Sequence, residues 1–559
     1  MNYNMKIALG IHIGHDRSVC IIKEGKVIAA LAQERVDRVK YSRSSEIPFE
    51  TIDLLFSYCS LNITDVSCIG LSYDSIEGNT VLDLYKDEFF NHYDCEYIPF
   101  ILVSHHDAHA HAVYYSSGFE ESIIFIADGG GDFINGKQEA ESIYIGKNGK
   151  ITCIAKRLQN IPVRHTIEPI NHIYPLMPEY VRNLEISLAN KYAQITYLLG
   201  FGWGEAGKTM GLASYGKSLL DFSKISFNGL GFSLTYKEII YQIFALQKLS
   251  GMNYKQFIKS ERANIANTVQ TYVEQAIISI SKYYINQYHC ANLCLSGGLF
   301  LNCLANHKIM NECNINNIFI LPASGDDGQA IGSAYCAYIN QFGYSKPFEI
   351  NLPYLGLSYT DEEIFQVINQ KNIGYERYSD NELVKLIAQH IKNNDIVALH
   401  RGRTEIGPRA LCHRSIIANP TNANMKNILN NRVKHREEFR PFAPTVITEE
   451  QFKYFELKKS SDYMLFATAV REEYREKLSA ITHIDNTARV QAISKQQEPF
   501  IHSLLIEIKK QIGFPIVLNT SFNVAGQPIV ESPLDAINTF LTADIDVLVI
   551  GNYVLKKEL

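Results

Sequence analysis

The chain has 559 residues, of which 46% are hydrophobic and 20% are charged, and its formal net charge is −6 at pH 7. This length exceeds what one hydrophobic core usually organises, so we expect at least two domains, and the composition excludes a long disordered tail. The negative total argues against a general nucleic-acid surface. The eleven cysteines include no CxxC pair, so we expect reduced, buried thiols.

The N-terminal residues Met1 to Lys6 lack a charged segment followed by a long apolar one. No stretch of the sequence reaches the ~18 apolar residues that a membrane span requires. We therefore expect a cytoplasmic protein with no membrane partner.

The first predicted elements are a strand over Lys6–Ile13, a polar turn, a second strand, a hairpin turn at Lys23–Lys26 and a third strand. A similar apolar strand at Ser122–Ala127 runs into the glycines of ADGGGD, and the segment Leu293–Asn302 repeats the pattern in CLSGGLFLN. Strand, turn and strand with charged tips is typical of actin-like lobes. We expect these strand ends to converge on small residues.

A domain boundary is predicted near residue 350, where the helical run SAYCAYINQF is followed by the proline-containing segment GYSKPFEINLPYLGLS. The predicted domains are residues 1–348 and 349–559, both of the α/β class. The second contains a basic segment, Ile396–Val446, and ends in an alternation of strand, loop, helix and strand. The sequence shows no clear internal repeat.

The segment SHHDAHAHAVYYSSGF predicts a helix with Ser104 as its N-cap. His105 and His109 are four residues apart and share one face of that helix. Asp128, at the end of a predicted strand, is a natural third metal ligand, and Asp326 in PASGDDGQAIG is a candidate fourth. A mixed set of histidine and carboxylate ligands suits iron, manganese or zinc better than calcium.

Two alternatives to this metal site remain open from the sequence. Asp107 and His111 form a competing pair with the same spacing, and Asp327 competes with Asp326. A histidine-rich turn taken alone is more often structural or exposed than metal-binding.

Glycines directly after buried strands let backbone amides approach phosphate oxygens. Two such loops predict a nucleotide site, and their residues are Gly129, Gly130 and Gly131 in one, and Ser296, Gly297, Gly298 and the nearby Asn302 in the other. Strand-to-helix turns also need glycine for steric reasons alone, so each loop is weak evidence by itself.

Residues Gly202 to Thr209, GWGEAGKT, match the Walker A pattern of P-loop ATPases. The context argues against that interpretation, because the preceding ANKYAQITYLLGFG predicts a helix where a P-loop follows a strand. Two glycines also fall where a long helix should begin. Glu205 and Lys208 of this segment stay candidates for lining a site.

Ordered motifs along nearly the whole chain resemble O-carbamoyltransferases of the nodulation-protein and antibiotic-tailoring type, including the tobramycin and cephalosporin enzymes. The motifs are GIHIGHDRS, QERVDRVK, SHHDAHA, ADGGGD, GEAGKTMGLASYG, SGGLFLN, GDDGQAIGSA, GRTEIGPRALCHRS, VKHREEFRPFAP and LNTSFNVAGQPIVESP. One departure is His12, where relatives more often carry asparagine.

For the first domain the resemblance implies an actin-like (ASKHA) fold, similar to that of the threonylcarbamoyl transferases that modify tRNA. It also implies an Fe(II) site of two histidines and two aspartates. Those four positions fall on His105, His109, Asp128 and Asp326.

For the second domain the resemblance implies a YrdC-like fold with KxR and SxN signatures. They are matched by Lys434 and Arg436 and by Ser521 and Asn523. The resemblance further implies carbamoyl phosphate and ATP as substrates, with Mg²⁺.

The basic segment itself predicts an anion pocket, because arginines and a lysine alternate there with Gly402, Gly407, Pro408 and Pro441. Guanidinium groups bind phosphate and carboxylate in bidentate fashion. The candidate anion ligands are Arg403, Arg409, Arg414, Lys434, Arg436 and Arg440. The alternative is that these cations form surface ion pairs with Glu405, Glu437 and Glu438, which contribute little. Few aromatic residues interleave with them, which argues against a nucleic-acid groove.

The combined hypothesis is a two-step reaction in which the second domain makes carbamoyl adenylate and the first transfers the carbamoyl group to the hydroxyl of a small molecule, such as a sugar or natural product. His15 or Asp16 would assist the acceptor. Two rivals are threonylcarbamoyl transfer to tRNA, which the acidic total opposes, and an actin-like ATPase regulatory module, which leaves KxR and SxN unexplained. The acceptor, the native metal and the oligomeric state stay open.

Overall fold

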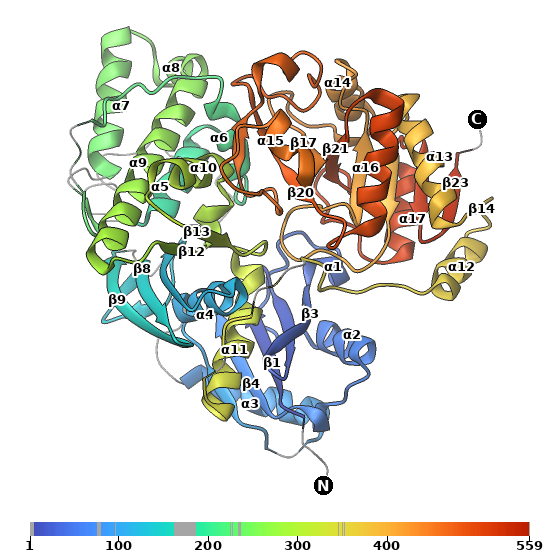
Figure 1. The fold of residues 1–559 in the computed structure, drawn as a ribbon. Helices are drawn as coiled ribbons and strands as arrows, with labels where there is room; N and C mark the ends of the chain where they lie inside the picture. Colours follow the sequence, from blue (N-terminus) through green and yellow to red (C-terminus); the bar gives the residue numbers. More distant parts are fainter. Residues whose placement is uncertain are drawn as a thin grey trace. The chain divides into compact units, whose positions relative to one another are not determined.

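The computed structural model describes residues 5–74, 80–95, 97–160, 186–223, 225, 227–232, 236–344, 346–348, 350 and 353–557 (Figure 1). Its contacts divide the chain into two compact units, Met1–Gly14 with Val66–Glu349 and His15–Asp65 with Ile350–Leu559. The predicted division after residue 348 stays a prediction, and the next residue, Glu349, lies outside the described residues.

The first sheet has the strand order β3-β2-β1-β4-β5. Its strands are β1 (Ile7–Ile13), β2 (Ser18–Lys23), β3 (Lys26–Ala32), β4 (Cys68–Tyr73) and β5 (Phe100–Leu102). Strands β1, β4 and β5 run parallel, while β2 and β3 form the predicted hairpin. Both hairpin turn residues, Glu24 and Gly25, have positive φ angles, as tight hairpin turns require.

The second sheet repeats this arrangement. Its strands are β6 (Glu121–Ala127), β7 (Phe133–Ile134), β8 (Lys137–Lys147), β9 (Lys150–Gln159), β12 (Asn292–Ser296) and β13 (Asn317–Ile320). The order is β13-β12-β6-β8, and β7 and β9 both pair with β8. In each sheet a central strand has an antiparallel hairpin on one side and two parallel strands on the other. This duplicated α/β topology confirms the predicted actin-like class, although the sequence itself shows no clear repeat.

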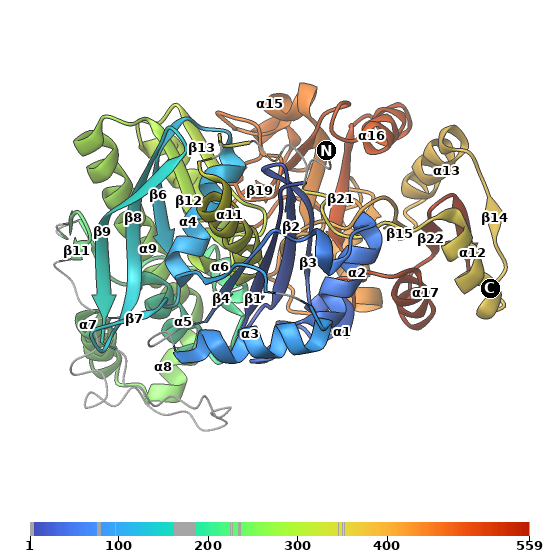
Figure 2. The same ribbon diagram turned by 90° about the horizontal axis from the view of Figure 1, so that it is seen from below.

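Two helices lie between β1 and β4 on one side and β6 and β12 on the other (Figure 2). They are α4 (His105–Ser117) and α11 (Gln329–Phe342). A Cβ atom on Gly332 of α11 would lie 1.7 Å from the carbonyl oxygen of Ala108, and one on Gly10 of β1 would lie 1.9 Å from that of Ala330. Glycine at these positions therefore lets α11 approach both α4 and β1 at backbone distance.

The remaining helices of the first unit are α3 (Thr80–Tyr93), α5 (Leu188–Leu198), α6 (Ala206–Ala213), α7 (Tyr236–Ser250), α8 (Tyr254–Ser260), α9 (Arg262–Tyr288) and α10 (Cys303–Glu312). A short hairpin joins β10 (Phe227–Asn228) to β11 (Gly231–Phe232). The long helix α9 contacts α5, α6 and α10 and buries much of its length.

Among the described residues of the second unit, an eight-stranded sheet has the order β14-β23-β22-β15-β16-β21-β17-β20. Its strands are β14 (Glu376–Arg377), β15 (Val397–His400), β16 (Arg414–Ala418), β17 (Ala443–Ile447), β20 (Gln491–Ile493), β21 (Ile516–Ser521), β22 (Val547–Ile550) and β23 (Tyr553–Lys556). A separate antiparallel pair is β18 (Ala467–Ala469) with β19 (Thr487–Arg489).

The helices of this unit are α1 (Glu34–Asp37), α2 (Phe49–Cys59), α12 (Asp361–Gln370), α13 (Asp380–Lys392), α14 (Met425–Leu429), α15 (Gln451–Tyr454), α16 (Pro499–Ile512) and α17 (Pro533–Thr542). Apolar residues of α13 and α16 pack with alternate residues of β15 and β22 into one hydrophobic core. The predicted C-terminal alternation of strand, loop, helix and strand is confirmed by β21, α17 and β22. The YrdC-like assignment stays a prediction.

In the described part of the chain, no helix is long and apolar enough to cross a bilayer. All eleven cysteines are free thiols. Seven are buried, Cys59, Cys95 and Cys336 are partly buried, and Cys153 on β9 is exposed, so the prediction that every thiol is buried is wrong at these four positions.

Candidate functional site

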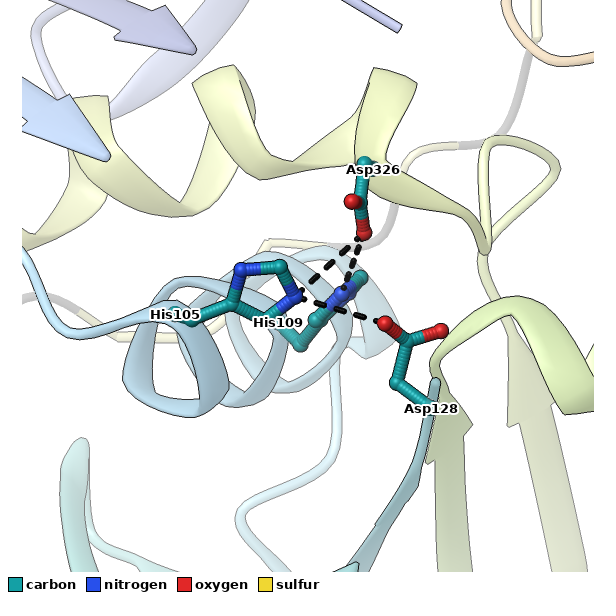
Figure 3. Close-up of side chains that lie close together, drawn as sticks. All are labelled: His105, His109, Asp128 and Asp326. Carbon is teal, nitrogen blue, oxygen red and sulfur yellow. Dashed lines mark hydrogen bonds and ion pairs between the residues drawn. The ribbon is translucent and has the colours of Figure 1, made fainter. Parts of the chain in front are cut away.

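The four predicted metal ligands meet in the first unit (Figure 3). The Nε2 atom of His105 lies 3.3 Å from Asp128 Oδ2 and 3.5 Å from Asp326 Oδ1, and His109 Nε2 lies 3.1 Å from Asp326 Oδ1. One ligand atom from each of the four residues lies within 4.8 Å of all the others. Helix α4 supplies the histidines, the end of β6 supplies Asp128, and the turn before α11 supplies Asp326.

Neighbouring groups orient these ligands. His105 Nδ1 lies 3.0 Å from the Tyr73 carbonyl oxygen, and His109 Nδ1 lies 3.1 Å from Ser296 Oγ. The amide of Gly298 donates to Asp128 Oδ1 at 2.6 Å. Histidines that bind metals usually have the second ring nitrogen held in this way, so the donor set fits a divalent cation.

The electrostatics of the centre also fit a cation. Burial lowers the pKa of His105, but Asp326 and Asp128 outweigh it and hold that pKa well above its usual range. The two carboxylates beside this buried imidazole thus favour a positive charge between them, which either a proton or a metal ion supplies.

The competing ligand pairs do not join this centre. Asp107 accepts a hydrogen bond from the Tyr144 hydroxyl at 2.8 Å, and His111 Nδ1 lies 2.7 Å from the Asp107 carbonyl oxygen. Among the described residues, the group around His105 includes Asp326 and not Asp327.

Ser104 occupies the N-cap position of α4 as predicted, but its side chain makes no capping hydrogen bond. Asp132 accepts instead, from the His105 amide at 3.1 Å. Gln329 was missed entirely, although its Nε2 atom lies 3.0 Å from His105 Nε2 and 3.3 Å from His109 Nε2. The sequence offered one indication of this contact, because Gln329 follows Asp326 by three residues, and residues at that spacing share one face of a helix.

The residues of the predicted glycine loops lie close to neighbouring protein groups. A Cβ atom on Gly130 would lie 2.5 Å from the Gln138 side chain, and one on Gly131 would lie 2.4 Å from Glu139. The Gly297 amide donates to the Ser324 carbonyl, and the Gly298 amide holds Asp128. The amides of Gly297 and Gly298 thus have partners within the protein, and the predicted role of these four glycines in nucleotide binding stays untested.

The other residues of the predicted nucleotide loops have protein partners too. The Gly129 carbonyl accepts from the Asn190 and Ser187 side chains, and Ser296 holds His109. Asn302 caps α10 by accepting from the Ala305 amide at 3.1 Å. Their predicted role in nucleotide binding stays untested.

The Walker A match does not form a P-loop setting. Helix α5 precedes it, as predicted, and α6 is a short helix that begins at Ala206. Lys208 Nζ lies 2.6 Å from Glu205 Oε1, so these two candidates pair with each other.

The candidate acceptor-assisting residues His15 and Asp16 also contact each other. His15 Nδ1 lies 3.1 Å from Asp16 Oδ2, and both side chains are partly exposed. A histidine and carboxylate pair of this kind is able to accept and hold a proton.

In the second unit, the predicted KxR and SxN residues meet. Lys434 Nζ donates to Asn523 Oδ1 at 2.9 Å and to Ser521 Oγ at 3.3 Å, and it also contacts both backbone carbonyls. Ser521 donates to Asn523 Oδ1 at 2.7 Å. Lys434 is buried, with only 4% of its surface exposed. The Ser521 and Asn523 groups that it contacts are all uncharged.

Further positive charge surrounds Lys434. Burial lowers its pKa well below the usual range, and Arg436, Arg440 and Lys40 lower it further. Burial lowers the pKa of Arg436, and repulsion from the positive charges of Arg440 and Arg489 lowers it further, to about 9. The buried Nε of Arg436 makes no hydrogen bond within the described residues. Like charges gathered in a buried place favour the binding of an anion.

Arg436 also lines a polar cavity of about 870 Å³. Its other lining residues are Asn424, Asn427, Ile428, Asn430, Asn431, Arg432, His435 and Glu438. Lys40 and Arg489, which sequence reasoning missed, lie far from Lys434 in the chain, and no spacing pattern links them to it.

Two predicted anion ligands have a structural role instead. Arg403 donates to the carbonyls of Gly356, Leu355 and Ile28. Arg414 is fully buried and donates to several backbone carbonyls, with Glu531 3.9 Å away. We therefore assign both to the packing of the second unit, because their donors already bind carbonyl oxygens.

The alternative of surface ion pairs does not describe these arginines either. Glu405 is buried, and its Oε1 accepts the amides of Leu411, His413 and Arg414. Arg409 and Arg440 stay candidate anion ligands.

Comparisons with known proteins identify the family of this chain. A family model described as "Carbamoyltransferase N-terminus" matches residues 79–335, and one described as "Carbamoyltransferase C-terminus" matches residues 388–557. Nodulation protein NolNO of Sinorhizobium fredii is 31% identical over 97% of this chain and 79% of its own length. Nodulation protein NolO of Bradyrhizobium diazoefficiens is 32% identical over 81% of this chain and 79% of its own.

Among solved structures, full-length HypF in its phosphate- and nucleotide-bound form is similar to this chain with a TM-score of 0.42 and 16% identity. That similarity covers 61% of this chain and 56% of HypF.

Proposed function

This chain belongs to the carbamoyltransferase family and is a carbamoyl-transferring enzyme, and from that premise we propose that it is an ATP-dependent O-carbamoyltransferase. It makes carbamoyl adenylate from carbamoyl phosphate and ATP, with Mg²⁺, and transfers the carbamoyl group to a hydroxyl of a small molecule. A sugar or another natural product is the proposed acceptor class.

The activation step is assigned to the second unit. Water converts carbamoyl phosphate to carbamate and phosphate, and the carbamate oxygen then attacks the α-phosphorus of ATP, releasing pyrophosphate and forming carbamoyl adenylate. The observation that carries this proposal is the contact of Lys434 with Ser521 and Asn523 beside the guanidinium of Arg436. These cations bind the anionic reactants and offset the negative charge that develops during adenylation.

The transfer step is assigned to the first unit. The acceptor oxygen attacks the carbamoyl carbon, AMP leaves, and the proton of the hydroxyl passes to a base. The His15 and Asp16 pair belongs to the second unit, so its role as that base stays a prediction from the sequence. His105, His109, Asp128 and Asp326 would hold Fe(II) or another divalent ion, which when bound polarises an oxygen of the donor. Ser296 and the Gly298 amide keep two of these side chains in place. We propose that the reaction takes place in the cytoplasm.

The proposal is tested by incubating the protein with ATP, Mg²⁺, labelled carbamoyl phosphate and a panel of sugars and natural-product alcohols. Mass spectrometry should show an acceptor whose mass has increased by one carbamoyl group, together with AMP and pyrophosphate. Hydroxylamine should trap the activated carbamoyl group even without the right alcohol. Hydrolysis of ATP to ADP and phosphate, at the same rate with and without carbamoyl phosphate, would contradict the proposal.

A further inference from the structure

A second group of possible metal ligands lies beside the first and shares one residue with it. One ligand atom from each of His12, Asp74 and Asp326 lies within 4.8 Å of the other two. The rings of His12 and His105 are 6.3 Å apart and nearly perpendicular. Asp326 therefore belongs to both groups of possible ligands. Figure 3 shows its carboxylate directed toward the rings of His105 and His109.

The parallel pairing of β1 and β4 explains why His12 and Asp74 meet. His12 pairs with Ser72 in the register, so the ends of both strands lie at the same edge of the sheet, and Asp74 directly follows β4. A Cβ atom on Gly14 would lie 2.0 Å from Asp74 Oδ1, and Gly14 has a φ of +110°. Glycine at this position thus allows the carboxylate to lie against the end of β1.

The geometry of His12 resembles that of the ligands in the first group. Its side chain is fully buried, and its Nδ1 lies 3.0 Å from Ser72 Oγ. Its Nε2 faces Asp74 Oδ1 at 3.9 Å, which is too long for a hydrogen bond between them. A ring held at Nδ1 with Nε2 turned toward carboxylates is the usual arrangement of a metal-binding histidine.

We propose that His12, Asp74 and Asp326 bind a second divalent cation, and that the Asp326 carboxylate bridges it to the cation held by His105, His109 and Asp128. One imidazole with two carboxylates suits manganese, iron or zinc. Carboxylate-bridged pairs of cations are typically ~3.5–4 Å apart and bind the oxygens of phosphoryl substrates.

The charge of the combined cluster favours two cations over one. The two groups together contain three carboxylates and three imidazoles. With neutral imidazoles, one divalent ion leaves a net charge of about −1 in a buried place, whereas two leave about +1. The preference for two ions rests on the proposed function. A negatively charged carbamoyl donor would be repelled by the cluster with one ion and attracted by the cluster with two.

The test is a count of bound Mn²⁺. The full chain is stripped with chelator, equilibrated with excess Mn²⁺, freed of unbound ion and analysed for metal per chain. We expect two equivalents for the wild type and one for His12→Asn, with a spin-coupled signal in electron paramagnetic resonance only for the wild type. Asp74→Asn should behave like His12→Asn, and the exposed His92→Asn should retain both ions.

The outcomes separate this inference from the proposed function. One equivalent in both the wild type and His12→Asn would overturn the second site and leave the first intact. Two equivalents in both would place the second ion elsewhere and also overturn it. No bound Mn²⁺ in the wild type would count against the first centre as well. Thermal unfolding of each variant checks that a lost ion does not reflect a lost fold.

Discussion

The Nδ1 atom of His105 lies 3.0 Å from the backbone carbonyl oxygen of Tyr73. A carbonyl oxygen only accepts hydrogen bonds, so Nδ1 carries the proton, and the lone pair of a neutral ring is on Nε2. That nitrogen faces Asp128 and Asp326. A fixed tautomer therefore prepares the ring to bind a metal ion together with the two carboxylates.

Replacing His109 of α4 should remove the metal ion of the four-residue group, whereas replacing His111 of the same helix should not. His109→Ala removes a ligand of the four-residue group, whereas His111→Ala removes a ring that contacts the Asp107 carbonyl instead. We expect the divalent metal bound per chain, measured by elemental analysis after dialysis, to fall by one equivalent for His109→Ala and to stay unchanged for His111→Ala. Equal loss in both variants would mean that the fold of α4, and not coordination, decides binding.

The approach of α11 to α4 is predicted to be sensitive to a single methyl group. Gly332→Ala would place a Cβ atom 1.7 Å from the Ala108 carbonyl oxygen. We expect destabilisation by about 1–3 kcal/mol or more in urea unfolding, and weaker metal binding, because α11 would shift away from the histidines.

Gly207→Ala is the matched control for this prediction. It lies in α6 with no atom within 4 Å of the added Cβ. We expect stability unchanged or raised by up to about 1 kcal/mol. Gly207 also occupies the glycine position before the lysine of the Walker A match, so loss of ATP-dependent activity in this variant would revive the P-loop interpretation.

Binding of an anion near Lys434 should take up a proton. Burial first, and then the neighbouring cations, lower the pKa of the free protein's Lys434, and a bound anion favours the ammonium form and raises that pKa again. Between these two pKa values, affinity for ATP should fall as pH rises. Calorimetry in buffers of different ionisation enthalpy measures the uptake, and Lys434→Met should abolish it. Uptake that persists in Lys434→Met would assign the proton to another group.

Arg414 should matter for stability and not for anion affinity. Arg414→Ala leaves the buried Glu531 and several carbonyls without their guanidinium partner, which should cost about 3–5 kcal/mol in urea unfolding. Arg440→Ala, by contrast, should weaken ATP binding with little loss of stability. A stable Arg414→Ala variant that binds ATP poorly would restore Arg414 to the anion pocket.

Much of the first unit could be predicted because local patterns determine it. The apolar strand before Gly14, the spacing of His105 and His109, and the strand end at Asp128 are visible in the letters of the sequence. The duplicated topology of the two sheets was not visible, because topology depends on strand pairing and different residues form the same pairs.

The errors in the sequence predictions concern what each group binds. A run of arginines does not reveal that the donors of Arg403 and Arg414 bind carbonyl oxygens, because burial depends on contacts between distant segments. A glycine after a strand does not reveal whether its amide binds phosphate or, as at Gly298, an aspartate. His12 and Asp74 meet only through the pairing of β1 with β4, which no local pattern specifies.

The central claim is that the two units perform separate steps, and a comparison of two variants tests it most directly. Pyrophosphate release that depends on carbamoyl phosphate and ATP is measured for the wild type, Lys434→Ala and His109→Ala, together with carbamoylation of an acceptor found in the alcohol panel. Lys434→Ala should lose both reactions, whereas His109→Ala should still release pyrophosphate and fail to carbamoylate. Loss of pyrophosphate release in His109→Ala, with its fold intact by circular dichroism, would contradict the account.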